Sequence, residues 1–221
     1  GAIAALRKLA FPPPRWRSLA RAVRRRAAHF LREAAAPKPR TISMQKFIAG
    51  HAAASAFAAK DGEIVASIAY DVLVAQGTIG PPNVIRRVDC AQIQDAARKV
   101  ARRFGLSGMH GLDFIRDAAG DVHLIEINPR ATQGGTLAFG AGRDLPAALA
   151  ASLSSPNCGM RPAIENDIVA FFPRAWQPGG GEAWLPSAHH DIPWDDPAVL
   201  RAMLAMPADA NDNEVRARIY R

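Results

Sequence analysis

The stretch that decides the fold is residues 111–130, Gly-Leu-Asp-Phe-Ile-Arg-Asp-Ala-Ala-Gly-Asp-Val-His-Leu-Ile-Glu-Ile-Asn-Pro-Arg. Two apolar runs, residues 109–116 and 122–127, flank a short polar segment that contains Gly120. Runs of this length, separated by turn-forming residues, are typical of two antiparallel strands. The stretch therefore predicts a β-hairpin.

The register of this hairpin decides which side chains share a face. If residues 118–121 form a four-residue loop, counting outward from the loop places Asp113 opposite Glu126, with Cβ atoms about 5 Å apart. Asn128 lies two residues beyond Glu126 and points to the same face of its strand. The other face is expected to carry the apolar side chains Leu112, Phe114, Ile125 and Ile127.

Two carboxylates and an amide oxygen on one face indicate a site for a divalent cation. Carboxylates directly opposite each other repel, so a bare sheet does not favour this arrangement. A bound cation reverses the sign of that interaction, and hard oxygen ligands suit Mg²⁺, which takes few carboxylates together with phosphate oxygens and water. Any one of these side chains alone is more often an ordinary solvated strand residue. Their alignment favours a Mg²⁺ or Mn²⁺ site at Asp113, Glu126 and Asn128.

The residues that follow the hairpin add features of an anion site. Pro129 ends the strand because it has no N–H to donate. Arg130 then stands at the mouth of the site, where a guanidinium can bind phosphate oxygens and stabilise charge that develops during transfer. Residues 132–136, Thr-Gln-Gly-Gly-Thr, are expected to form a flexible loop whose backbone N–H groups approach an anion. His110 is a candidate supporting group beside the site.

The order Gly-x-Asp-Phe-Ile, a turn, and Leu-Ile-Glu-Ile-Asn-Pro-Arg before a Gly-rich loop resembles the ATP-grasp superfamily, which includes carbamoyl phosphate synthetase, biotin carboxylase and D-alanine–D-alanine ligase. The resemblance implies that Asp113, Glu126 and Asn128 bind Mg²⁺ at the phosphates of ATP. It also implies that Arg130 contacts phosphate or an acyl-phosphate intermediate.

A second stretch, residues 44–50 (Met-Gln-Lys-Phe-Ile-Ala-Gly), resembles the strand of that superfamily that meets the adenine edge. The resemblance implies that ATP is contacted at Gln45, Lys46, Phe47 and Ile48. It further implies an α+β fold, the C-terminal lobe of an ATP-grasp protein, with a mainly antiparallel sheet and flanking helices.

Other local patterns predict the remaining elements. Strands are expected at residues 42–48, 52–59, 64–70, 84–88 and 167–172, with an Asp-Gly turn between the second and the third and a loop over 71–83. A helix with a capping box at Asp89 and Gln92 is expected to end at Gly105. Further helices are predicted near 144–153 and from Asp196 onward.

Charge divides the chain into unequal parts. Residues 1–40 hold 11 of the 28 Lys and Arg residues and one acid, Glu33, so they carry +10 while the rest carries −2. We therefore expect three parts: a basic helical segment at 1–40, the tail of an absent ATP-grasp subdomain or its replacement; a nucleotide- and metal-binding lobe at 41–150; and an extension at 151–221 packed on the lobe through its tryptophans.

Composition limits the class of protein. With 49% hydrophobic and 22% charged residues, the chain has enough apolar material for one sizeable core. No run approaches 18 apolar residues and no secretory leader is visible, so a soluble, cytoplasmic protein without membrane partners is expected. Cys90 and Cys158 lack metal-ligand spacing and are expected to be ordinary small apolar residues.

The resemblance implies the C-terminal part of an ATP-dependent ligase that joins a small carboxylate to an amine, or less often a thiol, through an acyl phosphate. Such a part is not expected to complete a ligation alone, and a homo-oligomer remains open. Two alternatives are a nucleic-acid-binding module built on the basic segment, which the acidic remainder disfavours, and a degenerate ATP-grasp protein with a structural role.

Overall fold

The computed structural model describes residues 19–20, 23–24, 44–77, 80–153, 161–205 and 217–219. The chain divides into two compact units, Gly1–Phe47 and Ile48–Arg221. In the first unit, residues 19–20 and 23–24 are helical and residues 44–47 belong to no helix or strand. The basic segment 1–40 and Cys158 thus lie largely or wholly outside the described residues.

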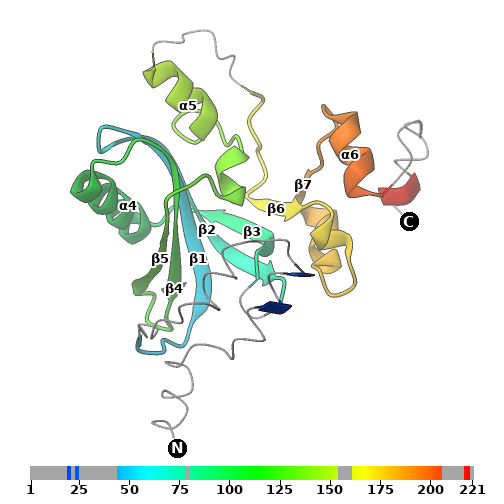
Figure 1. The fold of residues 1–221 in the computed structure, drawn as a ribbon, viewed down its shortest axis with the longest axis horizontal. Helices are drawn as coiled ribbons and strands as arrows, with labels where there is room; N and C mark the ends of the chain where they lie inside the picture. The colour runs from blue at the N-terminus through cyan, green and yellow to red at the C-terminus, as the bar shows by residue number, and fades with distance from the viewer. Residues whose placement is uncertain are drawn as a thin grey trace, which may run out of the picture. The chain divides into compact units, whose positions relative to one another are not determined.

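The second unit is built on a seven-stranded sheet in the order β5-β4-β1-β2-β3-β6-β7 (Figure 1). The strands are β1 (His51–Lys60), β2 (Glu63–Ala75), β3 (Pro82–Val88), β4 (Gly108–Arg116), β5 (Val122–Asn128), β6 (Ile168–Phe171) and β7 (His189–Asp191). All neighbouring pairs are antiparallel except β6 and β7. The helices α4 (Ala91–Phe104), α5 (Leu145–Ser152) and α6 (Pro197–Met203) complete the α+β fold expected from the sequence.

The first hairpin follows the Asp-Gly signal. Asp61 and Gly62 both have positive φ, at 50° and 85°, as a two-residue turn between right-twisted strands requires. Two predictions around it were wrong. Residues 44–48 are not a strand, because β1 begins only at His51, and β2 runs on to Ala75 through much of the predicted loop because it pairs with β3 there.

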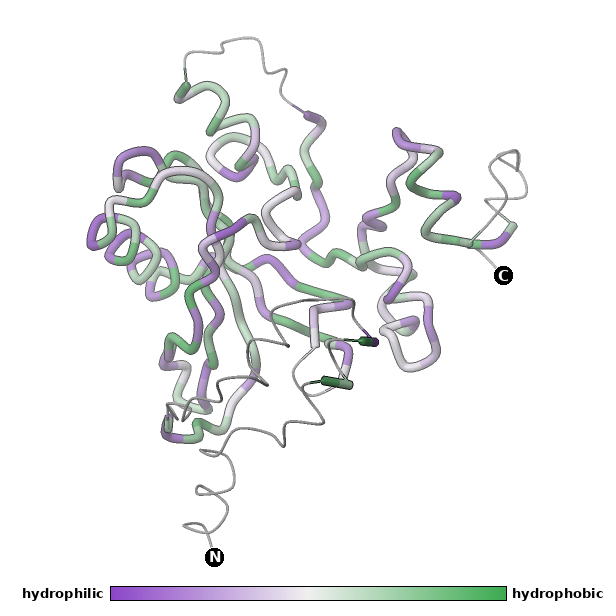
Figure 2. The backbone as a smooth tube through the Cα atoms, in the orientation of Figure 1, coloured by the Kyte–Doolittle hydropathy of each residue, from purple (hydrophilic) through white to green (hydrophobic). Residues whose placement is uncertain are grey.

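One face of the sheet is covered by α4. Its buried residues Ile93, Ala97 and Ala101 recur every four positions and so form one stripe. This stripe packs on Phe57, Leu112 and other residues of the sheet, all of them buried: Ala53, Ala59, Ala69 and Phe114. Along α4 the apolar stripe alternates with polar residues (Figure 2).

The ends of α4 are formed differently from one another. Gly105 ends the helix with a φ of +57°, and its N–H is donated back to Ala101 and Arg102. The predicted capping box was wrong, since Cys90 is the N-cap and makes no side-chain capping bond. Asp89 instead pairs with Arg87 and Arg143.

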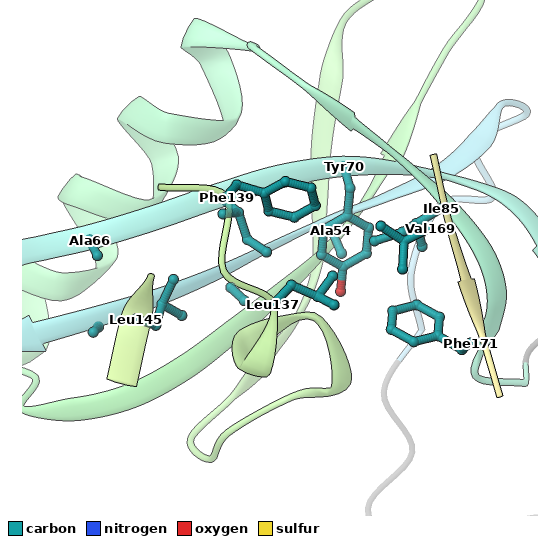
Figure 3. Close-up of a cluster of buried hydrophobic side chains, with 12 residues drawn as sticks. Ala54, Ala66, Tyr70, Ile85, Leu137, Phe139, Leu145, Val169 and Phe171 are labelled. Carbon is teal, nitrogen blue, oxygen red and sulfur yellow. The ribbon is translucent and has the colours of Figure 1, made fainter. Parts of the chain in front are cut away.

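The opposite face is covered by residues 137–149. Ala54, Ala56 and Ala58 alternate along β1 with residues that face α4, so both faces of this central strand are buried. Their small side chains belong to the same buried cluster as Leu137, Phe139 and Leu145, part of which Figure 3 shows. This face carries the candidate site at the β4–β5 end.

Residues after 161 continue the sheet with β6 and β7 and pack against this end of it. Trp176 and Trp184 contact Val84 and Ala170, and α6 starts with Asp196 as its N-cap and Pro197 in its first turn. Of the described helices, none is long and apolar enough to cross a membrane. The division into residues 41–150 and 151–221 stays a prediction.

Candidate metal and nucleotide site

Asp113 and Glu126 lie directly opposite each other on β4 and β5. The predicted pairing is confirmed, but the counting that led to it was wrong. Arg116 rather than Asp117 pairs with Val122, so the loop has five residues, and an extra residue, Ile125, bulges out of β5 before the acids are reached. Without that bulge, the five-residue loop would set Asp113 opposite Ile125 and turn Glu126 to the other face. The bulge therefore creates the acid pair.

Asn128 and Arg130 extend the acid pair. Asn128 is buried, and its Nδ2 donates to Oδ2 of Asp113 at 2.8 Å. Its Oδ1 accepts from Nη2 of Arg130 at 3.4 Å, and Nη1 of Arg130 also donates to the Ala131 carbonyl. The amide thus links the carboxylate to the guanidinium, as their common face predicts.

The electrostatics of the site are set by burial. The pKa of Asp113 is raised, first because the carboxyl is partly buried and further because Glu126 is close, while the Asn128 hydrogen bond and Arg130 act in the opposite direction. Removing a carboxylate from water and placing it beside a like charge both disfavour its ionised form. A nearby cation would relieve both costs.

The raised pKa of Asp113 makes a stability prediction. Ionisation of a group whose folded pKa exceeds its unfolded value of about 3.9 favours the unfolded chain. Asp113→Asn is therefore expected to unfold at a higher temperature than the wild type at pH 7, and the difference should vanish as the pH falls through about 4. Thermal melts between pH 3 and 8 measure this.

A matched control lies on the same hairpin. The pKa of Asp117 is lowered, chiefly by its hydrogen bond with His123, so this carboxylate stabilises the fold when it is ionised. Asp117→Asn should be less stable than the wild type at pH 7 and converge with it at low pH. Equal shifts for both variants would show that burial does not govern Asp113.

The loop after Arg130 is packed rather than flexible, which corrects the prediction for residues 132–136. Gln133–Thr136 forms a short 3-10 helix, and Gly134 and Gly135 are buried. A Cβ at Gly134 would lie 2.6 Å from the Tyr70 ring, and one at Gly111 would lie 2.3 Å from Cγ2 of Thr132. Because Gly111 and Gly134 have no side chain, Thr132 and Tyr70 can pack directly against their backbone.

Gly111 therefore allows a specific test of packing. Gly111→Ala should lower the free energy of unfolding by about 1–3 kcal/mol, because the new methyl group overlaps Thr132. Adding Thr132→Ala removes the two nearest atoms and should restore part of that loss. Urea unfolding of the single and double variants measures the difference; a double variant no more stable than Gly111→Ala would contradict this contact.

Tyr70 is a residue that the sequence did not single out. It pairs with Ala54 on β1, which pairs with Asp113 on β4, so Tyr70, Asp113 and Glu126 lie in one row across the sheet. Tyr70 is buried among Ala54, Leu137 and Phe171 (Figure 3). Burial, and then the nearby Asp113 carboxylate, raise the pKa of its hydroxyl. The signal in the sequence that could have placed Tyr70 on this face is its alternation with Ala66 and Ile68 along the strand.

Two other predictions concern His110 and residues 45–48. His110 is not beside the acids, since it faces α4, stacks on Phe57 at 5.5 Å between ring centroids and contacts the Ser107 carbonyl. Gln45, Lys46 and Phe47 are exposed, and Ile48 is half-buried. Because Gln45–Phe47 belong to the first unit, their contact with a nucleotide stays a prediction.

The donors at the site are two carboxylates and one amide oxygen. Within the described residues, no group of three or more His, Cys, Asp or Glu side chains is placed to hold a metal ion. A site at Asp113, Glu126 and Asn128 would therefore use fewer charged ligands than an all-protein cage, as is common for Mg²⁺ that is also held by phosphates.

Comparison with known families identifies the chain. The family model of the ATP-grasp domain matches residues 25–134, about half of the chain and including the hairpin with Asp113, Glu126 and Asn128. The chain belongs to the ATP-grasp superfamily. No match is found among curated proteins.

Several solved structures are similar to parts of the chain. The phosphoribosylaminoimidazole carboxylase ATPase subunit from Aquifex aeolicus is 13% identical, with a TM-score of 0.37 over 48% of this chain and 35% of that one. A biotin carboxylase complex from Campylobacter jejuni is 18% identical, with a TM-score of 0.34 over 40% and 22%. A putative ATP-grasp superfamily protein from Archaeoglobus fulgidus is 19% identical, with a TM-score of 0.36 over 48% and 36%. The chain thus spans little more than a third of their lengths at most.

Proposed function

We propose that this chain is the C-terminal, Mg·ATP-binding part of an ATP-dependent ligase that joins a small carboxylate to an amine, or less often a thiol. The observation that carries the proposal is the pairing of Asp113 with Glu126 and the link through Asn128 to Arg130. Family membership supports it. Because the chain covers only a part of its relatives, the full ligation would need residues outside it.

The residues present fit a magnesium ion. Asp113, Glu126 and Asn128 supply hard oxygen atoms. Burial raises the pKa of Asp113, and a bound cation would favour the ionised form of this carboxyl group. When bound, the ion would neutralise charge on the ATP phosphates. Arg130 is exposed beside Asn128, where its guanidinium would hold phosphate oxygens through two parallel hydrogen bonds.

In the proposed reaction a substrate carboxylate oxygen attacks the terminal phosphorus of ATP, and the bond from that phosphorus to ADP breaks. The resulting acyl phosphate is attacked by an amine, which forms the amide, loses a proton and releases inorganic phosphate. These two steps require no nucleophile from the protein. Its residues position the phosphates and offset their charge, which is the main contribution that proteins make to phosphoryl transfer.

Calorimetry tests the proposal directly. The wild-type chain should bind ATP in the presence of Mg²⁺ and lose that binding when the metal is chelated. A chain that binds an oligonucleotide instead, with affinity that falls steeply as salt rises, would favour the basic module. A chain that binds neither would favour the degenerate, structural alternative.

A further inference from the structure

Arg174 joins the far end of the sheet to the loop beside the candidate site. It opens a short 3-10 helix after β6, outside the residues matched by the ATP-grasp family. Its Nη2 donates a short hydrogen bond to Oε1 of Gln133 and a second, at 3.2 Å, to the carbonyl of Pro82 on β3. Gln133 lies three residues after Arg130. A residue distant in sequence thus holds this loop.

The loop is fixed at three consecutive positions. Thr132 occupies the space left by the missing side chain of Gly111, and Gly134 packs beneath the ring of Tyr70. Between them, the Gln133 side chain is held by Arg174. Arg161 also reaches this loop, since its Nη1 donates to the carbonyl of Thr136 at 2.7 Å. The Arg174 bond restrains the side chain of Gln133, which is nearer to Arg130 in the sequence.

Arg130 depends on that restraint. Its guanidinium is exposed and bonds only to near neighbours, Oδ1 of Asn128 and the carbonyl of Ala131, in the contacts that the described residues show. Both bonds are longer than 3.2 Å, so they hold the side chain weakly. The backbone of residues 129–133 therefore sets where this guanidinium points, and Gln133 anchors the end of that segment.

The Arg174 guanidinium is suited to such a role. Both bonds leave from Nη2, whose two N–H groups point to acceptors on different elements, Gln133 and Pro82. Its Nε is buried and has no hydrogen-bond partner within the described residues. Burying a donor without a partner costs free energy. Other interactions must offset that cost, and these are the two hydrogen bonds of Nη2 and the attraction to the nearby Asp191 carboxylate.

We propose that Arg174 is a positioning residue of the ATP site: by holding Gln133 it fixes the segment that carries Arg130, and so links the C-terminal extension to phosphate binding. The inference rests on the proposed function, because phosphate is the group that Arg130 would bind. Groups that support a first layer of ligands typically change affinity about 10–100-fold when removed.

The test compares four variants and one control variant by calorimetry with Mg·ATP and by thermal unfolding. Arg174→Met and Gln133→Met should each raise the Kd about tenfold, and the double variant should raise it no further because both remove the same bond. Arg174→Lys, which keeps a positively charged donor group on a differently shaped side chain, should recover part of the affinity. Arg102→Met is the control, since Arg102 pairs with Glu63 on the surface by α4. It should leave the Kd unchanged.

Hydrogen exchange gives a readout that needs no ligand. In Arg174→Met, amides of residues 130–136 should exchange faster than in the wild type, while those of β1 remain protected. A wild type that fails to bind Mg·ATP would overturn the proposed function and leave this exchange result to judge the contact. Unchanged exchange in residues 130–136, or an unchanged Kd with a lowered melting temperature, would overturn the positioning role.

Discussion

Removing either carboxylate of the pair is expected to weaken Mg·ATP binding by about a hundredfold or more, since within the described residues no third acidic side chain is placed to replace the lost charge. Asp113→Ala and Glu126→Ala leave a single carboxylate beside Asn128. Asp113→Asn and Glu126→Gln retain shape but not charge, and should fail to the same degree. Calorimetry at fixed Mg²⁺ measures these losses.

A matched control for this experiment lies at the tip of the same hairpin. Asp121 is an exposed acid on the loop, so Asp121→Asn changes the net charge as Glu126→Gln does without altering the paired strands. It should bind Mg·ATP within about twofold of the wild type. If Glu126→Ala binds as tightly as the wild type while its melting temperature is unchanged, the acid pair is not the metal site.

Truncation of Phe114 should have the largest effect on stability. Phe114 is 2% exposed and packs against α4 from β4, so Phe114→Ala should lower the free energy of unfolding by about 3–5 kcal/mol. Ile125 is 40% exposed on the edge strand, and Ile125→Ala should cost less than about 1 kcal/mol. Urea unfolding measures both.

The sequence pattern and the structure lead to different expectations for Phe114 and Ile125. Both were expected on one apolar face with Leu112 and Ile127. A comparable loss for Phe114→Ala and Ile125→Ala would mean that β5 is covered in solution, contrary to the exposed fraction of Ile125. A small loss for both would place the core elsewhere.

Short-range patterns in the sequence were sufficient for most elements. The stripe of α4 and the Asp-Gly turn depend on residues within a few positions of one another, so periodicity and turn chemistry predicted them. The alignment of Asp113, Glu126 and Asn128 was also predicted, but by a count that missed both the five-residue loop and the bulge, whose effects offset each other. The helical stripe and the turn are local signals, and no contact with the rest of the chain is needed to interpret them.

What sequence reasoning missed depends on distant partners. β2 extends to Ala75 because β3 pairs with it, and the exposure of Leu124, Ile125 and Ile127 follows from β5 lying at the edge of the sheet. The contacts from Tyr70 to Gly134 and from Arg174 to Gln133 join residues more than forty positions apart. No local pattern encodes such contacts, and a single-residue bulge leaves no mark in composition.

The bulge at Ile125 shifts the pairing of β4 and β5 by one residue, because β5 has one more residue than β4 between the two paired positions on either side of it. The outer part, from the tip to Leu124, follows one register, and the inner part, with Glu126 and Asn128, follows another. Without the bulge, the acids would remain opposed only if Asp117 paired with Val122 across a four-residue loop, so the bulge and the length of the turn are linked. Among related proteins that retain the acid pair, we therefore expect one-residue length differences to accumulate in this turn.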